Sequence, residues 1–160
     1  MKPLEAAYIA GFFDGDGSVR IQFQPRKNAR LKFRVRAEIS FAQKIGHEKQ
    51  LLWIREKLGI GYIYTRNDGM SELKVEGFKQ VKAILQFMTP FVHFKEKQVQ
   101  LTLTALSILD KDPKLVTSRD LIRIAQIGDQ ISSHNYVTVK KKYTAAFITE
   151  ALMKIYPRND

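Results

Sequence analysis

Residues 8–18 read Tyr8-Ile9-Ala10-Gly11-Phe12-Phe13-Asp14-Gly15-Asp16-Gly17-Ser18, a short helical pattern that runs into an Asp-Gly-Asp-Gly turn. Small side chains recur at spacings of three and four around this helix, which would let a second helix approach closely along one side. They are Ala6, Ala7, Ala10 and Gly11. The segment therefore predicts a helix that packs tightly against another helix.

The turn that ends this helix is a candidate site for a metal ion. Gly15 and Gly17 permit a sharp exit from the helix and leave Asp16 at its foot. A carboxylate in that place, beside free backbone carbonyls, suits a hard divalent cation. An EF-hand calcium loop is excluded, because its sixth and twelfth positions would be Val19 and Pro25 instead of glycine and glutamate.

The chain has 160 residues, enough to bury a substantial core, and we expect a single domain over residues 1–160. It contains no cysteine, which excludes disulfides and thiolate metal sites. The three histidines are far apart and show no ligand spacing. Neither a signal peptide nor a membrane-spanning run is recognisable, so we expect an intracellular protein that does not enter membranes.

The charge of the chain is strongly positive and unevenly distributed. The net charge is +11, and seven basic residues with no acidic one lie between Arg20 and Arg36. Such a concentrated excess favours a polyanion, and nucleic acid is the first candidate. An acidic membrane surface is the alternative, but those surfaces usually bind a basic amphipathic helix rather than strands.

The hydrophobic periodicity predicts an α+β protein. The expected elements, in order, are a helix at 4–13, strands at 19–24 and 31–41, a helix at 47–58, strands at 62–66 and 72–76, and helices at 78–88, 94–109, 118–132 and 143–155. Asn67-Asp68-Gly69 is a strong signal for the turn of the second hairpin. We expect a core over about 4–90 and a helical C-terminal part over about 91–156.

Polar side chains alternate with apolar ones along the predicted strands, so they share one face of the sheet. They form our candidate set of DNA contacts: Arg20, Gln22, Gln24, Lys32, Arg34, Arg36, Glu38, Ser40, Tyr62, Tyr64, Arg66, Glu72 and Lys74. Arg and Lys pair with guanine edges, Gln with adenine and Glu with the cytosine amine, so the set could read a major groove. The alternative is an ordinary solvated sheet face.

The helix with its Asp-Gly-Asp-Gly turn, followed by two hairpins separated by a helix, resembles the LAGLIDADG family of homing endonucleases. The resemblance implies an αββαββα core whose four-stranded antiparallel sheet forms a saddle over DNA, with additional C-terminal helices. One such core fills the chain. Residues 106–112 resemble a second motif, but they lack the glycines and precede Pro113, so we interpret the similarity as accidental.

A single motif in this family implies a homodimer in which the two motif helices pack on each other. The interface residues expected from the resemblance are Ala7, Ala10, Gly11 and Asp14. Asp14 would cap the helix or support the interface rather than bind metal. The packing would also bring the two Asp16 carboxylates together.

The resemblance also supplies catalytic roles. Asp16 and the carbonyl of Gly15 would bind Mg²⁺, with two or three ions in the dimer. Mn²⁺ would substitute for Mg²⁺, and Ca²⁺ would bind without supporting cleavage. Gln43 would orient solvent at the scissile phosphate, and Lys95 would polarise the site, although the neighbouring Lys97 could be confused with it. His47 stands near a position where some relatives carry arginine.

Lys140, Lys141 and Lys142 precede the last predicted helix. A run of lysines is usually a solvated segment, whereas in the family this region contacts phosphates at the flank of the DNA site. Both readings stay open for these three residues.

The resemblance thus implies a Mg²⁺-dependent endonuclease that makes a double-strand break in a long pseudo-palindromic DNA target and leaves short 3′ overhangs. A mobile intron would encode the protein, which would act in a prokaryotic cytoplasm or an organelle. The alternative is a relative that has lost cleavage and acts as a DNA-binding protein or an intron RNA maturase. A basic transcriptional regulator is a weaker option, because the motif would then have no purpose.

Overall fold

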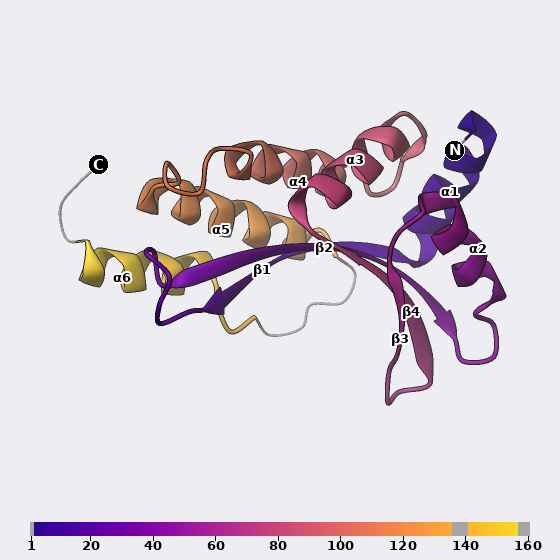
Figure 1. Ribbon diagram of the computed structural model, residues 1–160, viewed down its shortest axis with the longest axis horizontal. Helices are drawn as coiled ribbons and strands as arrows, with labels where there is room; N and C mark the ends of the chain where they lie inside the picture. The colour runs from indigo at the N-terminus through magenta and orange to yellow at the C-terminus, as the bar shows by residue number, and fades with distance from the viewer. Residues whose placement is uncertain (1, 136–140, 157–160) are drawn as a thin grey trace.

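The helices and strands follow the expected order (Figure 1). The computed structural model describes residues 2–135 and 141–156. Its elements are α1 (Pro3–Asp16), β1 (Gly17–Pro25), β2 (Phe33–Lys44), α2 (Lys49–Leu58), β3 (Tyr62–Thr65), β4 (Met70–Glu76), α3 (Phe78–Met88), the 3₁₀ helix η1 (Thr89–Phe91), α4 (Glu96–Leu109), α5 (Ser118–Ser133) and α6 (Ala145–Ile155). The α+β class predicted from the sequence is confirmed.

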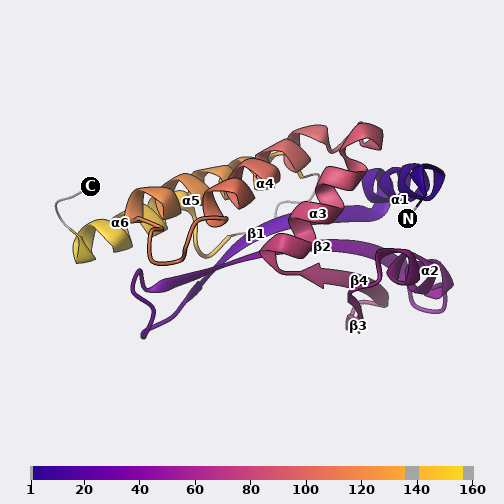
Figure 2. The same cartoon turned by 45° about the horizontal axis from the view of Figure 1, so that its top comes forward.

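The strands form one antiparallel sheet in the order β1-β2-β4-β3. Arg20 on β1 lies opposite Glu38 on β2, and Glu38 in turn lies opposite Glu76 on β4. Helices α3, α4 and α5 lie over one face of the sheet and leave the opposite face uncovered (Figures 1 and 2). Within the described parts of the chain, no helix is long and apolar enough to cross a membrane.

The covered face of the sheet forms the floor of the hydrophobic core. Val19, Ile21 and Phe23 of β1 are buried, while the side chains between them are only partly covered, as strand alternation requires. One cluster of buried apolar residues extends from Ile9 in α1 to Leu152 in α6. The boundary near residue 90, which would separate a core from a helical tail, stays a prediction.

The connection between β1 and β2 differs from the expectation. Lys32 was expected on the polar strand face, but β2 begins only at Phe33, and Lys32 has a left-handed backbone with φ 61°. Backbone hydrogen bonds from Lys32 to Ala29 and from Ala29 to Arg26 close two successive tight turns. Lys32 is therefore exposed on a hairpin loop, and its placement in the strand was wrong.

Helix α1 has two sides with different environments. Ile9, Ala10 and Phe13 are buried in the core, whereas Gly11 is exposed and a Cβ there would meet nothing within 4 Å. Gly17 is different, because a Cβ at this residue would lie 2.4 Å from the ring of Phe13 and 2.6 Å from its carbonyl oxygen. Only glycine lets β1 leave the helix this abruptly.

Candidate active site and nucleic-acid interface

Three predicted catalytic residues lie together at the C-terminal end of α1, which we call its foot. The side-chain amide of Gln43, near the end of β2, donates a hydrogen bond to the Asp16 carboxylate at 3.3 Å. Lys95, directly before α4, donates from its ammonium group to the carbonyls of Asp14 and Gly15. Asp16 itself is exposed, so its carboxylate is accessible to a ligand.

Lys95 occupies an unusual place for a lysine, since only 7% of its surface is exposed. Burial lowers the pKa of its ammonium group, while the negative charges of Asp14 and Asp16 act in the opposite direction. Lys97 is exposed on α4. The structure thus distinguishes the two lysines that the sequence left easy to confuse, and Lys95 is the one that reaches the foot of α1.

Asp14 joins α1 to the segment before α4. Its carboxylate accepts backbone N–H hydrogen bonds from His93 at 2.7 Å and from Lys95 at 3.0 Å, and the residue is 7% exposed. It therefore supports the site from the interior instead of facing a partner. Ala10 is also fully buried in its own chain. Of the four residues expected at a dimer interface, only Gly11 and the half-buried Ala7 face outward.

We expect Asp14→Asn to destabilise the fold by about 2–3 kcal/mol, because one of the two backbone donors would lose its charged acceptor in a buried place. Urea unfolding followed by circular dichroism would measure this loss. Asp16→Asn is the matched control and should change stability by less than about 0.5 kcal/mol, since Asp16 is exposed. Equal stability of both variants would contradict the supporting role of Asp14.

The foot of α1 offers oxygen donors of the kind that Mg²⁺ prefers, namely the exposed Asp16 carboxylate and the Gly15 carbonyl. Within residues 2–135 and 141–156, no group of three or more His, Cys, Asp or Glu side chains converges on one point. Mg²⁺ commonly keeps several waters and uses one or two carboxylates together with substrate phosphates. The donors present fit such an ion, provided that water, substrate or a second chain completes its coordination.

The uncovered sheet face carries the other candidate residues. Gln22 lies opposite Arg36 and Gln24 opposite Arg34, so the polar side chains of β1 and β2 form adjacent rows. Tyr62 and Tyr64 on β3 are 47% and 49% exposed at the far edge. With the exception of Lys32, the candidate DNA contacts of both hairpins therefore lie on or beside one open surface.

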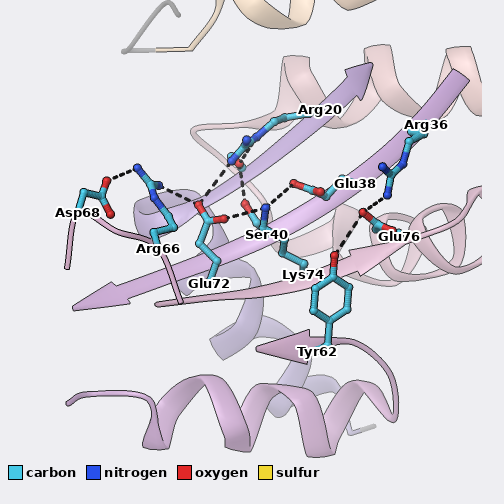
Figure 3. Close-up of polar contacts among 11 residues, drawn as sticks. Arg20, Arg36, Glu38, Ser40, Tyr62, Arg66, Asp68, Glu72, Lys74 and Glu76 are labelled. Carbon is cyan, nitrogen blue, oxygen red and sulfur yellow. Dashed lines mark hydrogen bonds and ion pairs between the residues drawn. The ribbon is translucent and has the colours of Figure 1, made fainter. Parts of the chain in front are cut away.

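Acidic side chains neutralise much of the middle of this surface (Figure 3). Glu72 is the centre of the network, with Arg66 at 2.9 Å, Lys74 at 3.1 Å and Arg20 at 3.6 Å. Burial would raise the pKa of Glu72, but hydrogen bonds from Lys74 and Arg66 outweigh it and lower that pKa. The cations in the middle of the sheet are therefore already paired.

A second set of contacts extends the network along β4. Glu76 pairs with Arg36 and accepts a hydrogen bond from the Tyr62 hydroxyl at 3.4 Å. Arg66 also pairs with Asp68 in the hairpin turn. Glu76 and Asp68 were not among the candidates chosen from the sequence. Strand alternation already places Glu76 on the polar face, and its pairing with Arg36 depends on how β4 pairs with β2. Asp68, in contrast, meets Arg66 within the same hairpin turn.

The three C-terminal lysines have different positions. Lys140 lies outside the described residues. Lys141 forms an ion pair with Asp129 at 3.0 Å, which gives it a contact within the fold. Lys142 is exposed, with its ammonium 5.5 Å from the centre of the Tyr143 ring. Of the two described lysines, only Lys142 is exposed enough to meet a phosphate without rearrangement.

Comparisons with known proteins agree with this architecture. The family model described as LAGLIDADG endonuclease matches residues 9–106. DNA endonuclease I-CvuI of Chlorella vulgaris is 33% identical over 154 residues, which cover 95% of this chain and 92% of the relative. DNA endonuclease I-CreI of Chlamydomonas reinhardtii is 29% identical over 139 residues, covering 84% and 80%.

A crystal structure of I-CvuI in complex with its target, determined in the presence of calcium, matches with a TM-score of 0.86 and 30% identity. The match covers 96% of this chain and 95% of that chain. The family model spans more than half of the sequence, and the first of these relatives is similar over nearly its whole length. The chain belongs to the LAGLIDADG endonuclease family.

Proposed function

We propose that two copies of this chain form a Mg²⁺-dependent homing endonuclease that cuts both strands of a long, roughly palindromic DNA target and leaves short 3′ overhangs. The observation that carries this proposal is the exposed Asp16 carboxylate, held beside Gln43 and Lys95 at the edge of an open polar sheet. Such an enzyme would be encoded by a mobile intron and would act in a prokaryotic cytoplasm or an organelle.

The outward side of α1 supports a dimer. Glycine in the middle of a helix costs about 1 kcal/mol relative to alanine. Gly11 and Gly15 have nothing within 4 Å of a hypothetical Cβ, so the described fold gives no reason for their small size. Tyr8 and Leu4 on the same helix are 58% and 84% exposed. A second copy of α1 would use the glycines for close approach and bury these apolar side chains.

In the cleavage reaction, Asp16 and the Gly15 carbonyl would hold the metal ion, which supplies charge to activate a water and to stabilise the leaving 3′ oxygen. Gln43 already donates to Asp16 and would hold solvent beside the carboxylate with its remaining amide groups. The Lys95 ammonium would contribute positive charge close to the phosphate that is attacked. Mn²⁺ would substitute for Mg²⁺, and Ca²⁺ would support binding alone.

The sheet would enter the major groove on each side of the cleavage point. Asp16 is the last residue of α1 and directly precedes β1, so the active site lies at the end of the strand that carries Arg20 and Gln22. The basic hairpin loop at 26–32 would reach phosphates farther out. In this arrangement every protomer reads one half of the target.

Arg34 and Arg36 should differ in their contribution to DNA affinity. Arg34 is exposed, and no carboxylate of the described residues lies within ion-pair distance, whereas Arg36 is paired with Glu76. We expect Arg34→Gln to reduce the slope of log affinity against log salt by about one, the value for one lost phosphate contact. Arg36→Gln should leave the slope nearly unchanged.

Filter binding at several salt concentrations measures both slopes. Arg119→Gln provides a charge-matched control, because Arg119 is exposed on α5, over the covered face of the sheet. Equal slopes for wild type and Arg34→Gln would mean that this end of β2 does not contact phosphates.

The test of the proposed function is cleavage of a plasmid library that carries randomised target sites, with Mg²⁺ and with Ca²⁺, followed by sequencing of the cut ends. Paired breaks at one long near-palindrome with Mg²⁺ alone are the expected result. Selective DNA retention without cutting would instead indicate a DNA-binding relative, and retention of a folded intron RNA would indicate a maturase.

A further inference from the structure

Glu38 is the least satisfied polar side chain of the open sheet face. The residue is 7% exposed, and its Oε1 atom has no hydrogen-bond donor among the described residues. The nearest ammonium group belongs to Lys74, 3.8 Å away, which is an ion-pair distance but too long for a hydrogen bond. Figure 3 shows this carboxylate between Arg20, Lys74 and Glu76.

The neighbourhood of Glu38 makes its burial unfavourable in the free chain. Burial raises the pKa of its carboxyl group, and the nearby Glu76 and Glu72 act in the same direction against Lys74 and Arg20. A buried acceptor without a donor destabilises a fold, and a second carboxylate directly opposite adds repulsion. Nothing in the described fold requires a glutamate here, so the missing donor points to a ligand.

The cations that cover Glu38 have other partners. Lys74 lies closer to Glu72, at 3.1 Å, and its ammonium is 4.7 Å from the centre of the Tyr64 ring. The Arg20 side chain is 39% exposed and contacts Glu72 only at 3.6 Å. Lys74 can therefore move away from Glu38 and keep its contacts. Among the described residues, the partly exposed Arg20 makes only long contacts, to Glu72 and from its Nε atom to the Ser18 hydroxyl at 3.4 Å.

In the major groove, only the amines of cytosine and adenine offer hydrogen-bond donors on the base edges. Adenine carries the N7 acceptor beside its amine, which would repel a carboxylate. Cytosine carries no acceptor there, and its partner guanine presents O6 and N7, which suit an arginine. A carboxylate directly across the strands from a guanidinium thus matches a C·G pair better than the other base pairs.

We infer that Glu38 and Arg20 together recognise one C·G base pair in each half of the DNA target. The Glu38 carboxylate accepts a hydrogen bond from the cytosine amine, and Arg20 donates to the guanine. This inference rests on the proposed function, since it names the base that the sheet reads. At sites without cytosine the buried carboxylate gains no donor, so Glu38 also disfavours wrong sequences.

The experiment selects binding sites from a random DNA library in Ca²⁺ and compares wild type with Glu38→Gln. Glutamine preserves the shape of the side chain but removes its charge. The wild type should prefer C·G at one position per half-site by about tenfold or more, and the variant by less than about threefold, with other positions unchanged. Arg20→Gln should weaken the preference at the same position, which gives a second route if Glu38→Gln folds poorly.

Glu150→Gln is the charge-matched control, because Glu150 is 68% exposed on α6 and pairs only with Lys154 among the described residues. Its base preferences should equal those of the wild type. An unchanged preference in Glu38→Gln, a uniform loss at every position, or a lost preference for A·T would overturn the inference. If the wild type selects no site at all, the proposed function itself fails.

Discussion

Asp16→Asn should reduce cleavage by at least about a hundredfold while DNA binding stays within a few-fold of the wild type. The substitution keeps the size of the side chain and an oxygen that can accept the hydrogen bond from Gln43. It removes the negative charge that would hold Mg²⁺, and the loss of one preorganised electrostatic contact in an active site typically costs a factor of this size. Because Asp16 is exposed, the fold should not change.

Cleavage of the selected target in Mg²⁺ and filter binding in Ca²⁺ measure the two properties separately. Asp112→Asn serves as the control, since Asp112 is an exposed aspartate in the loop between α4 and α5 whose carboxylate accepts only the backbone N–H of Lys114 in the described structure. Asp16→Asn with normal Mg²⁺-dependent cutting would remove Asp16 from the metal site.

Gly11→Leu should convert the dimer into a folded monomer without cleavage activity. In the proposed dimer the substitution inserts two leucines into one symmetric helix pair, and each overpacked side chain costs about 1–3 kcal/mol. Within the chain there is open space at Gly11, and leucine favours a helix more than glycine does. The monomer should therefore still unfold cooperatively, although at a lower temperature than the wild type, because it lacks the stabilisation that association gives a dimer.

Sedimentation equilibrium gives the oligomeric state, and thermal unfolding checks the fold. Gln126→Leu is the control, because it places the same side chain on an exposed position of α5. A dimer that is unaffected by Gly11→Leu would show that a partner does not dock on this side of α1.

Local patterns in the sequence were sufficient to predict the order of the helices and strands and most residues of the uncovered sheet face. Strand alternation depends only on neighbouring residues, so Arg20, Gln22 and Arg36 were correctly expected on one side. The spacing of small residues in α1 predicted close packing against another helix, but it did not predict which side of α1 the rest of the chain leaves exposed. Ala10 is covered by its own chain and Gly11 is not, and that difference depends on where the sheet and the later helices dock.

Contacts between distant segments could not be predicted in the same way. Asp14 binds backbone groups 79 and 81 residues away, and no local pattern of carboxylates reveals such a partner. The ion pairs of Glu72 with Arg20 and of Glu76 with Arg36 depend on how strands that a helix separates pair in the sheet. Lys95 and Gln43 were found through the family resemblance, since by themselves they read as ordinary surface residues.

The position of Lys95 also has a consequence for how the proposed dimer would assemble. The C-terminal end of a helix carries partial negative charge, so two α1 helices that meet at their feet would oppose each other together with their Asp16 carboxylates. The Lys95 ammonium already contacts the carbonyls of Asp14 and Gly15 near the end of α1, where it would act as a counter-ion in the proposed dimer. Association of two chains would then not require a divalent ion. The proposed dimer would be able to bind DNA before the metal ion, and metal binding would be a separate step that permits cleavage.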